Sequence, residues 1–512
     1  MVLDGWGLTD SKKGNAIAAA NIPTIKKLEE FYPYISLQAS GISVGLPWGE
    51  PGNSEVGHMT LGTGKVIYQS MPRITMAIQS GEFFKNESFL RAIEHAKKNN
   101  SAIHLMGLVG KGGIHSSVDH LYALLELMRD QKFSNVFIHV FTDGRDSAPT
   151  SATESIRELQ HRLAMYGVGK IATISGRYYA MDRNNNWDRV ERAYSAMTEG
   201  KGEKITDPME YLSKSYAKDI FDEYIEPAVV FEKDNPVATV KENDALIFFN
   251  FREDRARQMT KAFALPGFSK FKKEEIKNLH FVTMVQYEED LPVDVAYGPI
   301  EIKNCLGEII SKRKMSQLRI AETEKFAHVT YFFNGGNEEP FPKEERVIIP
   351  SKAVPSFDKA PEMSANEITE KVIESLDKKN YEFILINYAN PDIVGHTGNE
   401  KAAISAIETV DRCLEKLIKA VLLRNGCLLI TSDHGNVEEM TNARTGEVDT
   451  EHSSNPVPFW YVNSQNHRET PKEKPQAPIS GLLSDIAPTI LELLDIEKPQ
   501  EMTGESLLNC LK

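Results

Sequence analysis

The chain is poor in cysteine and has no long hydrophobic run. Four of its 512 residues are cysteines, and they show no paired spacing of the kind that holds a metal. We therefore expect neither a disulfide framework nor a cysteine-based metal site. No apolar run approaches the ~18 residues that a membrane-spanning helix needs, so we expect no contact with the membrane interior.

The chain also lacks an excess of basic residues. It carries 59 Lys and Arg against 73 Asp and Glu, a formal net charge of −14. This balance argues against binding to nucleic acid or to an anionic membrane surface. The first ten residues contain Asp4 and no Lys or Arg, unlike a signal peptide. We expect a cytoplasmic globular protein, in which any anionic ligand needs a local cationic pocket.

Short apolar runs alternate with helical patterns along the chain. At ~150 residues per domain, the length predicts two to three domains. Alternation of this kind is typical of α/β folds with largely parallel sheets. The predicted strands are 136–141, 170–175, 245–251, 280–285, 383–389 and 427–432, and the clearest helices are 151–165, 187–197 and 400–423.

Polar residues follow nearly every apolar run, and they differ in kind along the chain. The runs near both termini lead into Asp and His, whereas those in the middle lead mainly into Arg. Ligands of open α/β sheets bind beyond the carboxyl ends of the strands. We therefore predict a metal-binding domain formed by residues 1–70 and 299–512, interrupted by an anion-binding domain at 71–298. The chain is expected to cross between them near 69–75 and 297–302.

Three carboxylates and three imidazoles form the first candidate site. Asp392 and His396 stand four residues apart, Asp433 is adjacent to His434, and Asp4 and His452 complete the set. Such mixed ligands suit Mn²⁺, Zn²⁺, Fe²⁺ or Co²⁺, and six groups are too many for one open catalytic ion. Two metal ions are the natural interpretation. Taken singly, each residue is equally well a turn, cap or core residue.

Ser54 lies in a glycine-rich segment and is the candidate nucleophile. Glycines allow close approach of backbone to ligand, and a helix N-terminus at Ser54 would favour phosphate. The chain has neither a G-x-S-x-G elbow nor a Walker motif. A metal would then have to activate the serine hydroxyl. The alternative is a helix-capping serine without chemistry.

Five arginines in the middle of the chain form the second candidate site. Arg145, Arg177, Arg183, Arg252 and Arg255 follow apolar runs, and converging guanidinium groups would bind a small ligand with two or three negative charges. His115, in a glycine-rich loop, adds a possible donor. Since acidic residues flank several of these arginines, surface ion pairs of little energetic value are the alternative.

Ten segments, spread in order along nearly the whole chain, match the pattern of a known family. They are LDGWG (3–7), GNAIAAAN (14–21), GNSEVGH (52–58), GGIHSSVDH (112–120), FTDGRD (141–146), GRYYAMDR (176–183), NFREDRARQ (250–258), AETEKFAHVTYFFNGG (321–336), NYANPDIVGHTGN (387–399) and TSDHGN (431–436). Together they resemble the cofactor-independent phosphoglycerate mutases of the alkaline phosphatase superfamily. The resemblance implies an alkaline-phosphatase-like α/β domain interrupted by an inserted second α/β domain.

The resemblance also implies a role for each candidate residue. Ser54 would be the phosphorylated serine, with one Mn²⁺ held by Asp392, His396 and His452. The other Mn²⁺ would be held by Asp4, Ser54, Asp433 and His434, although other divalent metals are acceptable. Asp146 and Lys325 join Ser54 as catalytic residues, and substrate binding falls to His115, Arg145, Asp146, Arg177, Arg183, Arg252, Arg255 and Lys325. The sequence pattern around Lys325 alone predicts a solvated surface residue on a helix.

The implied activity is interconversion of 3-phosphoglycerate and 2-phosphoglycerate by a monomer, through a phosphoserine and without bisphosphoglycerate. Retention of glycerate between the two transfers would require the domains to close, with the crossings as hinges. The competing hypotheses are a metal-dependent phosphomonoester hydrolase, a phosphopentomutase and a non-catalytic metal- or phosphate-binding protein.

One departure from the family pattern concerns the start of the chain. Only three residues precede Asp4, whereas family members have a longer run there. Either the start of the chain is placed too late, or the protein manages with a short first strand, and fraying of that strand would weaken the metal site that includes Asp4.

Overall fold

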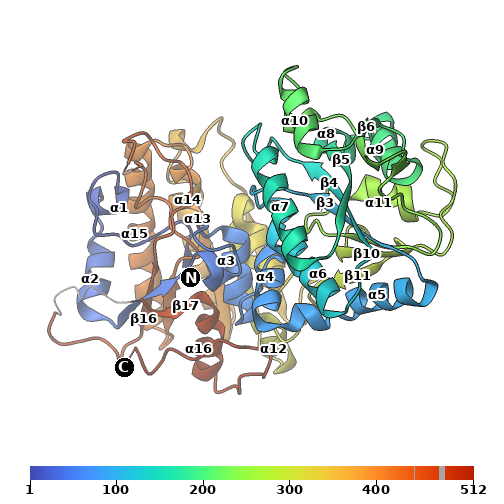
Figure 1. Ribbon diagram of the computed structural model, residues 1–512. Coiled ribbons are helices and arrows are strands. Elements are labelled where there is room, and N and C mark those ends of the chain that lie inside the picture. The colour runs from blue at the N-terminus through green and yellow to red at the C-terminus, as the bar shows by residue number, and fades with distance from the viewer. Residues whose placement is uncertain (443, 472–478, 512) are drawn as a thin grey trace. The chain divides into compact units, whose positions relative to one another are not determined.

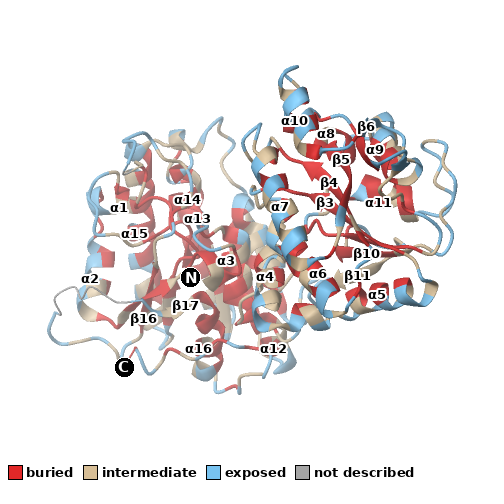
Figure 2. Cartoon of the chain, in the orientation of Figure 1, coloured by how far each residue is buried: buried red, intermediate tan, exposed pale blue. Residues whose placement is uncertain are grey.

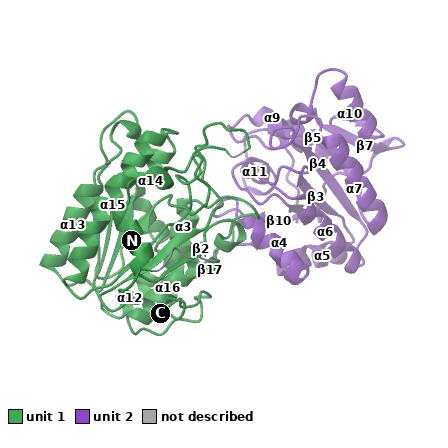
Figure 3. Ribbon diagram, turned by 90° about the vertical axis from the view of Figure 1, so that its left-hand side faces the viewer, with its two compact units in different colours: residues 1–69, 301–512 green, residues 70–300 purple. Residues whose placement is uncertain are grey.

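The computed structural model describes residues 1–442, 444–471 and 479–511, and the chain forms two compact units (Figure 3). Unit 1 comprises residues 1–69 and 301–512, and unit 2 comprises residues 70–300. Both are α/β units, as expected for one domain interrupted by another. The expected crossing at 69–75 is mostly helical, because α4 (Ser70–Ser80) begins at the division.

Unit 1 contains an eight-stranded sheet in the order β13-β12-β14-β1-β15-β16-β2-β17. All neighbours are parallel except β16, which is antiparallel to both β15 and β2. The strands are β1 (Val2–Leu3), β2 (Tyr34–Gln38), β12 (Gln317–Glu322), β13 (Glu344–Ile349), β14 (Phe383–Tyr388), β15 (Leu428–Thr431), β16 (Val457–Val462) and β17 (Ile479–Leu482).

Helices cover both faces of this sheet, because successive strand residues point to opposite sides. On β14, Ile386 packs with α2 (Pro23–Phe31), α13 (Ala365–Lys378) and α15 (Glu400–Leu422). The adjacent Leu385 packs with α3 (Ser54–Thr63), α12 (Leu306–Lys312) and α16 (Ile486–Leu493). Figure 2 shows the buried strands between these helix layers. None of the described helices combines the length and apolarity needed to cross a membrane.

Unit 2 contains a sheet in the order β11-β10-β9-β3-β4-β5-β7-β6, with β8 paired to β7. It is parallel except where β7 meets β5 and β8. The strands are β3 (Ile103–Leu108), β4 (Val136–Thr142), β5 (Lys170–Gly176), β6 (Glu203–Ile205), β7 (Ala228–Glu232), β8 (Asn235–Pro236), β9 (Ala245–Phe248), β10 (His280–Val285) and β11 (Asp294–Tyr297).

The helices of unit 2 lie against this sheet (Figure 1), and their buried apolar residues share one core cluster with those of its strands. They include α5 (Glu87–Asn99), α6 (Val118–Asp130), α7 (Ala152–Tyr166), α8 (Arg177–Ala180), α9 (Trp187–Glu199), α10 (Pro208–Tyr216) and α11 (Arg257–Ala264). The strands and helices predicted for this part of the sequence are therefore confirmed, with ends that differ by up to three residues.

A chain of buried polar groups crosses the sheet of unit 2. Asp244 Oδ2 lies 3.2 Å from His104 Nε2, and His104 Nδ1 lies 2.9 Å from His139 Nε2. His139 Nδ1 in turn lies 2.9 Å from Thr173 Oγ1. Since unpaired polar groups are costly in a core, these contacts fix the register of β3, β4 and β5 relative to one another.

The short strand β1 lies in the centre of the sheet of unit 1. Val2 and Leu3 pair with β14 on one side, and Val2 also pairs with β15 on the other. Both residues are buried, and the Asp4 amide donates to the Tyr388 carbonyl over 3.1 Å. The protein thus manages with a short first strand, and pairing on both sides compensates for its length.

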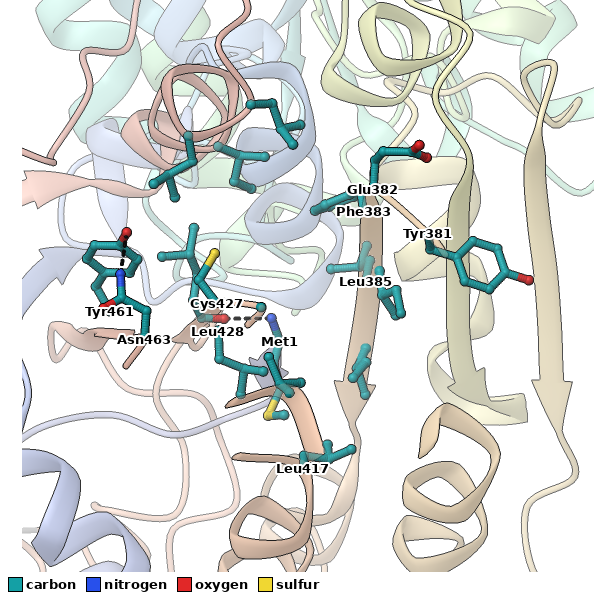
Figure 4. Close-up of a pocket in the computed structure, with 18 of the residues that line it drawn as sticks. Met1, Tyr381, Glu382, Phe383, Leu385, Leu417, Cys427, Leu428, Tyr461 and Asn463 are labelled. Carbon is teal, nitrogen blue, oxygen red and sulfur yellow. Dashed lines mark hydrogen bonds between the residues drawn. The ribbon is translucent and has the colours of Figure 1, made fainter. Parts of the chain in front are cut away.

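A cavity of about 670 Å³ lies at the amino-terminal ends of β14 and β15, beside Met1 (Figure 4). Its lining is mostly apolar and includes Phe383, Leu385, Leu417 and Leu428. The candidate ligands of unit 1 follow the carboxyl ends of the same strands, at the opposite end of the sheet. The cavity is thus separate from them.

Candidate active site

Ser54 is the first residue of helix α3 and is buried. The capping role belongs to the preceding Asn53, whose side-chain oxygen accepts the Val56 amide over 3.1 Å. The interpretation of Ser54 as the helix cap is therefore wrong. A Cβ at Gly57 would lie 2.7 Å from the Asp433 carbonyl oxygen, so this glycine permits α3 to approach the loop after β15.

The sheet order explains how distant residues meet at Ser54. Strands β14, β1 and β15 are neighbours, and Asp392, Asp4 and Asp433 follow them. Because the three strands are parallel, their carboxyl ends lie at one edge of the sheet. His396 is the C-cap of α14 (Asn390–Gly395), which carries Asp392, and His452 precedes β16.

The Ser54 hydroxyl contacts a carboxylate, an imidazole and an ammonium group. Ser54 Oγ donates to Asp4 Oδ1 over 3.2 Å and lies 2.9 Å from His434 Nε2. Lys325 Nζ donates to Ser54 Oγ over 2.6 Å. Ligand atoms of Asp4, Asp433 and His434 all lie within 4.8 Å of one another. These residues form the first group of potential metal ligands.

A second group surrounds Asp392. Its Oδ1 lies 3.3 Å from His396 Nε2 and 3.2 Å from His452 Nε2, and the two imidazole nitrogens are 3.0 Å apart. His434 Nε2 lies 3.9 Å from the same oxygen, so the two groups adjoin. Lys325 Nζ also contacts both groups, at 2.6 Å from Asp4 Oδ1 and from Asp392 Oδ2.

All three imidazoles of this centre are oriented by backbone carbonyls. The Nδ1 atoms of His396, His452 and His434 lie 2.7, 2.8 and 3.2 Å from the carbonyl oxygens of Thr450, Gly52 and Gly435. Since a carbonyl oxygen only accepts, each Nδ1 carries a proton, and each Nε2 faces the carboxylates, where it can bind a metal once any proton of its own is lost.

The donor set fits divalent metals. Asp433 Oδ2 is buried and makes no hydrogen bond of good geometry with the described residues, although His58 Nδ1 lies 3.2 Å away. Such an oxygen beside imidazole nitrogens matches the preferences of Mn²⁺, Zn²⁺, Fe²⁺ and Co²⁺. The two groups of residues can thus hold two ions that adjoin at His434.

Burial and charge shift the pKa values of this centre strongly. Burial lowers the pKa of Lys325, but the carboxylates of Asp4 and Asp392 outweigh it and the net pKa is raised. Burial also lowers the pKa of His434, yet Asp433 and Asp4 raise it to about 9. The pKa of Asp392 is held well below its usual range, because Lys325 and the histidines overcome the effect of burial. A metal ion must therefore compete with protons and with Lys325.

Three supporting residues were missed by the sequence analysis. His58 Nδ1 lies 3.2 Å from Asp433 Oδ2, Asn387 Nδ2 donates to Asp4 Oδ2 over 2.7 Å, and Asn436 Nδ2 donates to Asp392 Oδ1 over 3.0 Å. All are buried. Their one available signal is proximity in sequence, because each lies within five residues of a candidate ligand or of Ser54.

Lys325 was assigned to the surface by its own pattern, and this interpretation is wrong. The side chain is 4% exposed. It lies in a short 3-10 turn (Thr323–Lys325) that directly follows β12. Since β12 neighbours β14, the turn carries Lys325 to the same edge of the sheet as Asp392.

The arginine-containing site of unit 2 is built in the same way as the centre of unit 1. Its residues follow the adjacent parallel strands β9, β3, β4 and β5. The structure places all the predicted residues at the carboxyl ends of these strands: Arg252 and Arg255 after β9, His115 after β3, Arg145 and Asp146 after β4, and Arg177 and Arg183 after β5.

Two carboxylates hold the buried Arg177. Its Nη1 donates to Asp143 Oδ1 over 2.5 Å and to Asp146 Oδ2 over 2.6 Å. His115 Nε2 lies 3.8 Å from the same Asp146 oxygen. Burial, together with the Arg177 charge, lowers the pKa of His115 to about 4. His115 is therefore a neutral donor or acceptor at neutral pH.

Three of the remaining four arginines form ion pairs and stay accessible, whereas Arg255 donates to the Met181 carbonyl over 3.2 Å. Arg183 Nη1 donates to Asp254 Oδ2 over 2.8 Å, and Arg252 Nε lies 3.4 Å from the other Asp254 oxygen. The side chains of Arg145, Arg183 and Arg252 are 53%, 47% and 50% exposed. Ion pairing therefore does not prevent these groups from binding a ligand.

A cavity of about 170 Å³ adjoins three of the arginines, namely Arg145, Arg177 and Arg255. Arg189, Tyr178 and Tyr224 also line it. Its volume suits part of a small ligand, and its cationic lining favours an anionic group.

Comparisons with known proteins agree with this architecture. A family model described as the N-terminus of BPG-independent PGAM matches residues 74–289. A second model, described as type I phosphodiesterase / nucleotide pyrophosphatase, matches residues 318–472. The matches cover most of the inserted unit and a large part of unit 1, so the interrupted, alkaline-phosphatase-like α/β fold is confirmed.

Individual relatives match over the full chain. The 2,3-bisphosphoglycerate-independent phosphoglycerate mutase of Clostridium perfringens strain ATCC 13124 is 50% identical over 510 residues, 99% of this chain and 98% of its own length. That of Clostridium novyi is 50% identical over 508 residues, with the same coverage. A crystal structure of Leishmania mexicana phosphoglycerate mutase at low cobalt concentration has a TM-score of 0.55 and 31% identity, covering 98% of this chain and 96% of that one. The chain belongs to the family of 2,3-bisphosphoglycerate-independent phosphoglycerate mutases.

Proposed function

We propose that the protein is an isomerase that interconverts 3-phosphoglycerate and 2-phosphoglycerate through a phosphoserine at Ser54, without bisphosphoglycerate. The observation that carries this proposal is the environment of Ser54. The hydroxyl stands at the N-terminus of a ten-residue helix, 2.6 Å from the Lys325 ammonium and in contact with Asp4 and His434 of the first group of potential metal ligands. Family membership supplies the substrate.

Two Mn²⁺ ions are proposed as cofactors. Asp392, His396 and His452 would hold one, and Asp4, Ser54, Asp433 and His434 would hold the other. Bound there, the metals supply a Lewis acid that favours the ionised serine and offsets negative charge on phosphoryl oxygens. Carboxylate and imidazole ligands also accept other divalent metals.

Ser54 and Lys325 carry the first transfer. As the bond from Ser54 Oγ to phosphorus forms, the bond from phosphorus to the 3-oxygen breaks, and overall the serine proton passes to that oxygen. The Lys325 ammonium stabilises negative charge on the attacking and phosphoryl oxygens. The amides at the start of α3 favour the resulting phosphate.

The residues of unit 2 retain glycerate between the two transfers. The arginines bind its carboxylate, with His115 as a neutral hydrogen-bonding partner. Asp146 takes the proton of the 2-hydroxyl as that oxygen attacks the phosphoserine and the bond from phosphorus to Ser54 Oγ breaks. Overall, this proton passes from Asp146 to Ser54 Oγ, which restores both groups. Since phosphorus and carboxylate belong to one molecule, the proposal requires residues of 1–70 and 299–512 to act together with those of 71–298. A cytoplasmic monomer suffices for this scheme.

The decisive experiment is conversion of 3-phosphoglycerate with Mn²⁺ present and 2,3-bisphosphoglycerate absent, before and after chelation. We expect 2-phosphoglycerate to form only with metal. Release of inorganic phosphate and glycerate instead would identify a phosphomonoester hydrolase. Turnover of a pentose phosphate in place of phosphoglycerate would identify a phosphopentomutase.

A further inference from the structure

Asp143 is a buried carboxylate that joins several residues of the proposed substrate site. It follows β4 and is 1% exposed. Its Oδ1 accepts Arg177 Nη1 over 2.5 Å, the Asp146 amide over 3.1 Å and the Arg145 amide over 3.2 Å. Its Oδ2 accepts Ser147 Oγ over 2.9 Å. One side chain thus contacts three residues to which the proposed function gives a role.

The amide contacts fix the direction of the loop after β4. An Asp side chain that accepts amides two and three residues ahead closes a tight turn. This turn has no spare room, because Gly144 has φ +68° and a Cβ there would lie 2.7 Å from the Glu223 amide nitrogen. A Cβ at Gly112 would lie 2.6 Å from Asp146 Cβ. Asp146 is therefore held between Asp143 on one side and the loop after β3 on the other.

The Arg177 contact adds an electrostatic constraint. A single nitrogen, Nη1, bridges Asp143 and Asp146 inside the protein. Without the Asp143 charge, the buried guanidinium would keep one carboxylate partner and would be drawn onto Asp146 alone. Asp146 would then be less available to a substrate hydroxyl.

We propose that Asp143 is a positioning residue for the phosphoryl isomerisation, which holds Asp146 and Arg177 in the geometry that proton transfer needs. The inference rests on the proposed function, since it gives Asp146 its role. Asp143 itself exchanges no proton with substrate. Its contribution is made through the two side chains that it fixes.

The test compares Asp143→Asn with a matched variant, Asp244→Asn. Asp244 is also buried in unit 2, and its side chain accepts the Ala102 amide over 2.9 Å and the Lys241 amide over 2.7 Å. It precedes β9 and so lies at the opposite end of the strands from Asp143, and neither of these partners has a proposed role in the site. Each variant is assayed with Mn²⁺ for conversion of 3-phosphoglycerate and for hydrolysis of p-nitrophenyl phosphate, which has neither a carboxylate nor a second hydroxyl.

We expect Asp143→Asn to lower the mutase kcat about 100-fold, the scale of a misplaced catalytic group. Hydrolysis of p-nitrophenyl phosphate should stay within about twofold of the wild type, as should both activities of Asp244→Asn, because neither change touches Ser54 or its surroundings and Asp244 is remote from Asp143. A mutase kcat unchanged by Asp143→Asn would overturn the positioning role. Equal losses in both variants, or parallel losses of both activities, would also overturn it in favour of a purely structural role.

Ser147→Ala keeps the proposal testable if Asp143→Asn does not fold. This change removes the Oδ2 contact and keeps the charge of Asp143, and a loosened carboxylate should lower the mutase kcat several-fold with hydrolysis unchanged. An unchanged mutase kcat in Ser147→Ala would count against the positioning role. A wild-type protein that converts no 3-phosphoglycerate would instead overturn the proposed function, and the positioning role with it.

Discussion

The two candidate sites occupy equivalent positions in their α/β units but differ in how far their side chains are exposed. Both lie at the carboxyl ends of parallel strands. In unit 1, Asp4, Asp433, His434 and Lys325 are almost fully buried. In unit 2, Arg145, Arg183 and Arg252 are about half exposed. Groups that make and break bonds gain from a fixed, dry environment, whereas groups that capture an anion must first be accessible to it.

The difference extends to how each site balances its charge. In unit 1, the carboxylates are compensated by Lys325 and by imidazoles whose protons a metal can replace. In unit 2, Asp143, Asp146, Asp254 and Glu223 already compensate most of the arginine charge. The first site is therefore sensitive to metal and protons, and the second to the geometry of its ion pairs.

The largest effect should come from Ser54→Ala. This variant should fold but form no phosphoenzyme, and mutase activity should fall by at least about 10³-fold, because alanine has no hydroxyl to form the covalent intermediate. Hydrolysis of p-nitrophenyl phosphate should be lost as well. Intact-protein mass spectrometry after brief exposure to 3-phosphoglycerate checks the phosphoenzyme directly. Mutase turnover that survives the change would refute Ser54 as the nucleophile.

Arg252→Ala or Arg255→Ala should lower the mutase activity and leave phosphate-ester hydrolysis nearly unchanged. Loss of a charge-assisted hydrogen bond costs about 1.5–3 kcal/mol, which corresponds to a mutase kcat/KM lower by about 10- to 150-fold. Hydrolysis of p-nitrophenyl phosphate should change little. Arg129→Ala is the matched control, since Arg129 is an exposed arginine of unit 2 that pairs with Glu126 and Asp130. Equal losses in the two assays would assign Arg252 and Arg255 to the fold or to the phosphatase step.

Metal binding to unit 1 should release protons. The metal-free pKa of His434 is raised to about 9, because Asp433 and Asp4 outweigh burial. His434 is therefore protonated at pH 7.5 and must lose that proton on binding a metal. Affinity for Mn²⁺ should fall as the pH falls below 9. Calorimetry in two buffers with different ionisation enthalpies measures the proton release, and identical heats would contradict the prediction.

The smallest effect concerns Glu322, a buried carboxylate at the end of β12. Burial raises its pKa to about 7, although Ser351 and the Ser364 amide donate hydrogen bonds to it. Because the folded pKa lies above the unfolded value of 4.5, the contribution of Glu322 to the free energy of unfolding is fully present below pH 4.5. This contribution is lost as the pH rises through 7. Glu322→Gln should remove this loss and stabilise the protein at pH 8 by about 1–3 kcal/mol. Thermal unfolding at pH 5 and pH 8 checks it, and a gain at pH 5 equal to that at pH 8 would contradict the mechanism.

Much of the fold could be predicted from the sequence, because buried parallel strands are continuous apolar runs. The strands at 170–176 and 280–285 follow this rule, and the helix at 400–422 shows the helical period of apolar residues instead. The conspicuous site residues were also predictable, since Asp and His directly after such runs indicate ligands. The firm pairing of the short β1 was not predictable, because strand length alone does not reveal that both of its neighbours pair with it.

Residues whose role depends on buried contacts with other site residues were harder to predict. Nothing in the local pattern of Lys325 shows that three oxygens lie 2.6 Å from its ammonium group. Only the resemblance to a family identified it. Asp143 and His58 were missed for a related reason. Their partners are other site residues, and a single sequence does not show which side chains fix which.

The polar chain across unit 2 has a directional consequence. An ionised Asp244 only accepts, so His104 must carry its proton on Nε2 and present a lone pair at Nδ1. His139 must then donate from Nε2, and its own Nδ1 must accept from the Thr173 hydroxyl. One carboxylate at the edge of β9 thereby selects the tautomers of two histidines and the rotation of a hydroxyl three strands away. All three hydrogen bonds of this chain therefore donate in the same direction, across the strands towards β9.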